Sequence, residues 1–110
     1  EREADKLVAA AKAELEETKL KALKDARATV SKAEDSLANE QNELTEAKAE
    51  VAAAEVRLKK RATDENREQL QQELKDAQEA VTDEEQDVAE AKKELEQRQQ
   101  ELKKVETAAK

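Results

Sequence analysis

The 110-residue chain contains no aromatic residue, and it also lacks glycine, proline, cysteine, methionine and histidine. Without histidine or cysteine, the usual nucleophile–base pairs and most transition-metal sites cannot form. The only serines, Ser31 and Ser36, have no suitable base near them, and no glycine-rich loop is available to cradle a phosphate. We therefore expect a protein that is not an enzyme and that uses no cofactor or metal.

The residues that remain are those of a long helix. Charged residues make up 45% of the chain, and much of the 36% apolar content is alanine, which leaves too few large side chains for a globular core. This composition is typical of coiled coils. The net charge of −8 disfavours nucleic acid as a partner. No apolar run approaches the length that membrane insertion requires.

Large aliphatic residues recur every seven positions in two series, from Leu23 to Leu58 and from Leu74 to Leu102. Smaller or further apolar residues occupy the companion positions, as in the a/d seam of a coiled coil. The predicted seam consists of Leu23, Val30, Leu37, Leu44, Val51, Leu58, Leu70, Leu74, Ala77, Val81, Val88, Ala91, Leu95, Leu102 and Val105.

The two series are out of phase, and the misfit falls on the stretch KKRATDENRE, residues 59–68. We interpret this stretch as a turn, which predicts an all-α, antiparallel two-helix coiled-coil hairpin. Residues 1–110 would form one coiled-coil domain, with helices over 1–62 and 67–110 and a turn at 63–66. The main alternative is a parallel coiled-coil dimer of one long helix that absorbs the phase shift. A three-helix bundle and partial disorder are further alternatives.

The chemistry of the turn supports a helix end followed by a helix start. Lys59, Lys60 and Arg61 place positive charge where the dipole of the first helix favours it. Thr63 or Asp64 can act as the N-cap of the second helix. Because glycine is absent, we expect Asn66 or Asp64 to adopt the left-handed conformation that often ends a helix.

An antiparallel register centred on Asp64 places a large residue opposite a small one in most layers, such as Ala54 opposite Leu74 and Ala47 opposite Val81. Charged residues interrupt the seam at three positions: Glu40, Glu84 and Arg98. Arg98 can lay its aliphatic stem along the seam while its charged head stays in water. Glu40 and Glu84 would lie close together, and we expect this to be the weakest part of the hairpin.

Residues 1–18 have no partner in this register, yet they carry an apolar row of their own, one residue out of step with the Leu23 series. The row consists of Ala4, Val8, Ala11, Leu15, Thr18 and Ala22. We expect another protein, or a continuation of the same polypeptide, to pack on residues 1–22, and an oligomer is possible. The chain begins without methionine, which suggests a fragment of a larger protein.

Two charged regions are candidate binding sites. The basic tip, which comprises Arg57, Lys59, Lys60, Arg61 and Arg67, is a candidate partner-binding surface because a hairpin tip is easily reached. Helix-end electrostatics explains the same residues, and we favour that explanation. The acidic band TDEEQDVAE, residues 82–90, could bind a basic partner or a divalent cation. Its spacing matches no calcium loop, so we favour a solvated helix face.

The segments ELTEAKAEVAAAEVRL (43–58) and ELKDAQEAVTDEEQDVAEAKKELE (73–96) resemble the alanine-rich helical stalks of Gram-positive cell-wall surface proteins. That resemblance implies a non-catalytic structural spacer or protein-binding module at the cell surface or outside the cell. The pattern is also similar to the helical hairpin of colicin receptor-binding domains, although the aromatic and glycine residues of those tips are absent. This second resemblance implies a receptor-binding stalk of a toxin as the alternative function.

Overall fold

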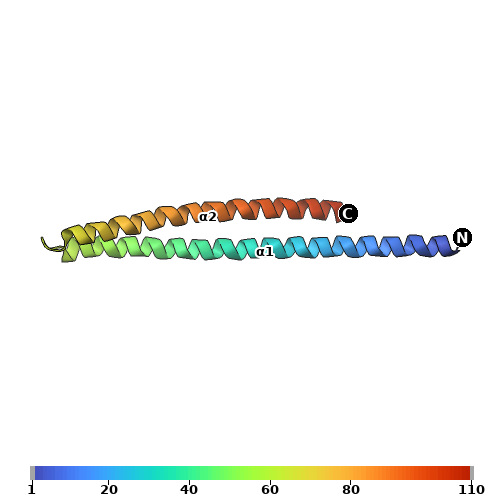
Figure 1. The fold of residues 1–110 in the computed structure, drawn as a ribbon, viewed down its shortest axis with the longest axis horizontal. Helices are drawn as coiled ribbons and strands as arrows, with labels where there is room; N and C mark the ends of the chain where they lie inside the picture. The colour runs from blue at the N-terminus through green and yellow to red at the C-terminus, as the bar shows by residue number, and fades with distance from the viewer. Residues whose placement is uncertain (1, 110) are drawn as a thin grey trace. The chain divides into compact units, whose positions relative to one another are not determined.

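The computed structural model describes residues 2–109, with side chains from residue 3 onward, and it shows an all-α helical hairpin (Figure 1). Helix α1 spans Arg2–Arg61 and helix α2 spans Arg67–Ala109. The chain leaves the helical conformation between them, so the alternative of one uninterrupted helix is not what this sequence adopts. Residues 1 and 110, the ends of the predicted domain, lie outside the described residues.

Both helices follow from local sequence preferences. No glycine or proline interrupts either of them, and alanine, leucine, glutamate and lysine are strong helix formers. Acidic residues occupy the first turn of α1, and three basic residues occupy its last turn. Both placements oppose the charge of the helix dipole and stabilise the helix ends.

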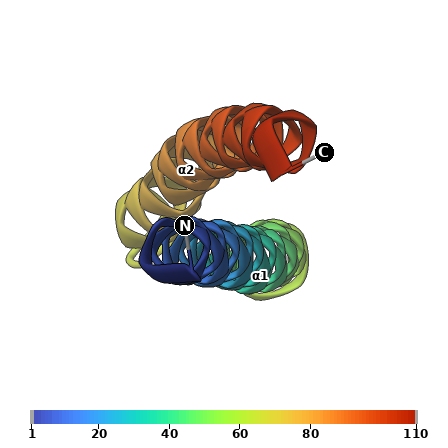
Figure 2. The same ribbon diagram turned by 90° about the vertical axis from the view of Figure 1, so that its right-hand side faces the viewer.

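The chain forms two compact units, and each contains a stretch of both helices. The first unit combines residues 1–34 with residues 94–110, and the second comprises residues 35–93 and includes the turn. Within each unit the two helices lie side by side (Figures 1 and 2). Each unit is therefore a short antiparallel helix pair with its own row of contacts.

Few apolar residues are buried in either unit. The most buried residues are Val30 and Ala33 in the first unit and Ala54 and Val88 in the second. All positions of the predicted seam are buried or half-buried. In the first unit they are Leu23, Val30, Leu95, Leu102 and Val105. In the second unit they are Leu37, Leu44, Val51, Leu58, Leu70, Leu74, Ala77, Val81, Val88 and Ala91. Ala54 is only 2% exposed, because a small side chain lets the two backbones approach closely.

Contacts within each unit identify the register. In the second unit, Arg57 of α1 forms an ion pair with Glu73 of α2, at 3.9 Å. Val51 and Val81 line one groove in the same unit. In the first unit, Ala109 lies beside Lys19 and Leu20. These pairs run antiparallel and lie within one helical turn of the register centred on Asp64.

Candidate functional site

The turn is closed by reciprocal hydrogen bonds between Thr63 and Asn66. The Thr63 backbone N–H donates to Asn66 Oδ1 at 2.6 Å, and the Asn66 backbone N–H donates to Thr63 Oγ1 at 3.3 Å. Asn66 Nδ2 also donates to the Arg61 carbonyl oxygen at 3.1 Å, which satisfies one of the last carbonyls of α1. Thr63 and Asn66 therefore form a capping-box pair in the turn that leads into α2, with asparagine in place of the usual glutamate or glutamine.

The expectation of a left-handed residue in the turn is wrong. No residue in the described range has a positive φ angle, and this includes Asp64 and Asn66. The physical reason is the Thr63–Asn66 pair, which satisfies the backbone groups of the turn without a left-handed residue. The absence of glycine therefore does not leave the backbone groups of this turn without hydrogen-bond partners.

The basic tip divides into two sets of residues. Arg57 is half-buried and pairs with Glu73, while Arg67 at the start of α2 pairs with Asp64 of the turn at 4.0 Å. The other three, Lys59, Lys60 and Arg61, are exposed in the last turn of α1. None of these three forms an ion pair within the described part of the chain. The accessible positive charge of the tip therefore comes from Lys59, Lys60 and Arg61.

The N-terminal part of α1 presents an uncovered apolar surface. Residues 3–18 are all exposed, including Val8 at 56% and Leu15 at 55%. Leu7 adjoins the predicted row and is 72% exposed. We call the surface formed by Ala4, Leu7, Val8, Ala11 and Leu15 the N-terminal row. Isolated apolar residues are common on protein surfaces, but a contiguous row along one helix face is a candidate interaction site.

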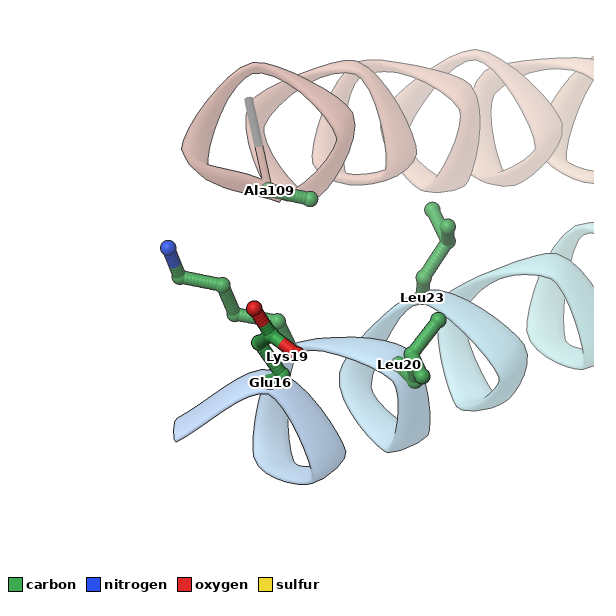
Figure 3. A pocket seen from close by; sticks show the side chains of 5 residues that line it. All are labelled: Glu16, Lys19, Leu20, Leu23 and Ala109. Carbon is green, nitrogen blue, oxygen red and sulfur yellow. The ribbon is translucent and has the colours of Figure 1, made fainter. Parts of the chain in front are cut away.

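Helix α2 ends where this surface begins. Ala109 borders an open groove of about 290 Å³ whose other lining residues, Glu16, Lys19, Leu20 and Leu23, belong to α1 (Figure 3). Leu23 is half-buried and points toward α2 in this view, whereas Leu20 is 66% exposed. The groove is the last place in the first unit where α2 covers α1.

Three carboxylates from both helices meet in the second unit. One carboxylate oxygen of each residue, Glu40, Glu84 and Asp87, lies within 4.8 Å of one oxygen of each of the other two. Glu40 and Glu84 are half-buried, and their Oε2 atoms have neither solvent contact nor a hydrogen-bond partner. This part of the acidic band is therefore not a solvated face. Asp83, Glu85 and Asp87 are exposed, as a solvated face requires.

This environment disfavours the charged form of Glu84. Loss of solvent contact raises the pKa of Glu84 from 4.5 to about 7, and the negative charges of Glu43, Glu40 and Asp87 act in the same direction. Arg98, the third charged residue of the seam, is held differently. It pairs with Glu94 at 3.6 Å and with Glu101 at 3.2 Å along α2, so its charge is compensated.

The chemistry that this arrangement supports is limited. Three carboxylates alone do not define a cation site, because calcium takes six to eight oxygen ligands and magnesium requires near-octahedral geometry. The grooves along the hairpin are open, and the carboxylate group has no nucleophile or histidine beside it. The structure offers open grooves and charged surfaces that other molecules can reach.

Reasoning from the heptads alone missed two features. The Arg57–Glu73 ion pair lies beside the seam, and the a/d pattern says nothing about flanking positions. The register centred on Asp64 could have found it, since it brings those two positions near each other. Leu7 and Leu20 also lie outside the predicted row, although a helical period of 3.6 residues places Leu7 next to it.

Comparison with family models, with curated proteins and with solved structures finds no significant match to this chain. Neither helix, over the residues that the structure describes, holds a stretch long and apolar enough to cross a bilayer.

Proposed function

We propose that the chain is a non-catalytic helical spacer that carries a docking face for a helix of another protein. The observation that supports this proposal is the N-terminal row, where Leu7, Val8 and Leu15 are each more than half exposed. The regular hairpin supplies the spacer, and the uncovered part of α1 supplies the docking face. A partner helix that covers these residues would gain the burial that the rest of α1 obtains from α2.

A helix continuing in the direction of α2 does not fit the row. Helix α2 packs on the side of α1 that carries Leu23 and Val30. The N-terminal row is one residue out of step with that side, which is about 100° around the helix at 3.6 residues per turn. The helix that covers the row must therefore approach from a different side of α1.

A second copy of the chain is the other occupant that the size pattern allows. In an antiparallel pair of copies centred on the row, Ala4 would face Leu15 and Val8 would face Ala11, so a large residue would meet a small one in each layer. A parallel pair would instead place Ala4 and Ala11 against the same alanines and leave their layers poorly filled. The oligomeric state of the chain alone therefore decides between a second copy and another protein.

The size pattern of the row indicates what that partner looks like. Large residues alternate with small ones, as they do along the stretch of α1 that α2 covers. There the register places Leu95 opposite Ala33, which is only 8% exposed. By the same packing, the docking helix should present leucine opposite Ala4 and Ala11, and a small residue opposite Val8 and Leu15.

A synthetic helical peptide of about 20 residues, built to this pattern, tests the proposal, since it spans about 30 Å of α1. Its binding to the 110-residue chain is measured by the fluorescence anisotropy of a label on the peptide. We expect saturable binding that Leu15→Glu weakens at least about tenfold, because the substitution buries an unpaired carboxylate. Leu20→Glu is the matched control, since Leu20 is an exposed leucine outside the row.

No binding, or equal weakening by the two substitutions, would overturn the proposed docking face. Sedimentation equilibrium of the chain alone checks the occupant. Self-association that Leu15→Glu abolishes would make a second copy the occupant in place of another protein. We extend the proposal to a place at the cell surface or outside the cell, on the resemblance of residues 43–58 and 73–96 to surface-protein stalks.

A receptor-binding stalk is the second candidate function, and the exposed charge of Lys59, Lys60 and Arg61 supports it. Three basic side chains on a protruding turn could hold an acidic patch on a receptor. In that case their replacement with alanine would abolish binding of the receptor and leave peptide binding at the N-terminal row unchanged.

A further inference from the structure

The carboxylates at the centre of the second unit occupy positions where a seam normally holds apolar side chains. Glu40 of α1 and Glu84 of α2 lie among half-buried Leu37 and Leu44 and buried Val88. An oxygen of Glu40 and one of Glu84 come within 4.8 Å of each other, and each residue has an Oε2 atom without solvent contact or a hydrogen-bond partner. Two charged carboxylates in this position would repel each other and leave both buried oxygens unsatisfied.

Nearby charges make the arrangement worse for two anions. Glu43 and Glu40 face Glu84 from α1, and Asp87 lies near it on α2 itself. None of the charged groups that shift Glu84 in this part of the chain is basic. Opposite charges normally compensate buried carboxylates. Nearer the turn, the partly exposed Glu73 has such a partner in Arg57. A proton is the simplest species that can relieve the repulsion between Glu40 and Glu84.

We propose that Glu40 and Glu84 form a proton-dependent contact of the hairpin, in which one proton held between them keeps the helices packed and its loss loosens them. When the proton is present, one carboxyl can donate a hydrogen bond to the other, and both buried oxygens gain a partner. When it is absent, two negative charges face each other across the helix pair. The hairpin is therefore more stable in mild acid than above neutral pH.

The sign of the pH dependence follows from proton linkage. The pKa of Glu84 is raised in the folded hairpin to about 7, from 4.5 for the ordinary group. Between these two values the folded chain binds more protons than the unfolded chain, so stability falls as the pH rises. The stabilising effect is complete below about pH 4.5 and is lost as the pH passes through about 7.

Thermal unfolding of the 110-residue chain, followed by circular dichroism at 222 nm between pH 5 and pH 8, tests the contact. We expect the midpoint temperature of the wild-type chain to fall by several degrees across this range. Glu84→Gln should largely remove the fall, because the amide cannot ionise and can donate to Glu40 at every pH. Glu85→Gln is the matched control, since it removes the same charge from an exposed neighbour and should leave the fall unchanged.

Equal pH dependence in Glu84→Gln and Glu85→Gln would overturn the proposal, because it would assign the effect to net charge. Titration of the glutamate side-chain carboxyl groups by ¹³C NMR gives a direct second measurement. It should show the Glu84 signal changing near pH 7 in the wild-type chain and at a lower pH in Glu40→Gln. A Glu84 signal that changes at the ordinary value in the wild-type chain would equally exclude the contact.

Discussion

Truncation of one buried valine measures how much the apolar row contributes to stability. Val88→Ala removes two methyl groups from a side chain in the second unit that is 7% exposed. At about 0.8 kcal/mol for each buried methyl-sized group, the lost burial amounts to about 1.6 kcal/mol. The space left behind adds to this loss, whereas alanine is the better helix former by about 0.5 kcal/mol. We expect a net loss of about 1–1.5 kcal/mol in the free energy of unfolding.

Val56→Ala is the matched control, because the same two methyl groups are removed from a side chain that is 52% exposed. Because Val56 is only about half buried, the lost burial amounts to roughly 0.8 kcal/mol, and the gain in helix propensity offsets most of this loss. Urea unfolding followed by circular dichroism at 222 nm compares the midpoints of the two variants and the wild-type chain. Equal losses in the two variants would refute the conclusion that the row between the helices stabilises the hairpin.

Two other substitutions examine close packing and the turn. Ala54→Leu should destabilise the hairpin by about 1–3 kcal/mol, because Ala54 is 2% exposed and the larger side chain would force the helices apart. Ala53 is exposed, so Ala53→Leu is the control and should change stability by no more than about 0.5 kcal/mol in the same urea assay. Asn66→Ala should lower the free energy of unfolding by about 1 kcal/mol, because the side chain loses its hydrogen bonds to Thr63 and Arg61. Asn42 is exposed within α1, so Asn42→Ala is the control and should not destabilise the helix. A thermal melt of Asn66→Ala identical to that of the wild-type chain would show that the capping box is dispensable.

The hairpin could be predicted because its sequence signals are regular and agree with one another. The seven-residue spacing assigns Val30 and Val88 to the interior, and both are 7% exposed. The phase break between Leu58 and Leu74 shows where the apolar side shifts by two residues. A continuous helix can absorb such a shift, so the basic residues at 59–61 and the capping residues that follow them are what favour a turn there. The antiparallel register then follows from size complementarity, and the 2% exposure of Ala54, which that register places opposite Leu74, agrees with it.

The remaining features depend on geometry that a seven-residue pattern does not contain. Glu40 and Glu84 were expected to lie close together, but which of their oxygen atoms lose solvent depends on side-chain rotamers. The left-handed residue expected in the turn is absent from residues 2–109 for a related reason. Propensity suggests a left-handed residue where glycine is missing, whereas Thr63 and Asn66 meet the same hydrogen-bonding requirement with side chains.

The capped turn also has a consequence for how the chain folds. Over residues 2–109, contacts between the two helices join residues close in sequence only near this turn, as Arg57 and Glu73 do. Every layer further from the turn would have to close a longer loop if it formed first, at a growing entropic cost. Folding should therefore begin at Thr63 and Asn66 and proceed outward from the turn. Each pair of residues that has formed a contact shortens the loop that the next pair must close. The Glu40–Glu84 layer lies partway along this path, so the pH of the solution should set the speed of folding at that point as well as the final stability.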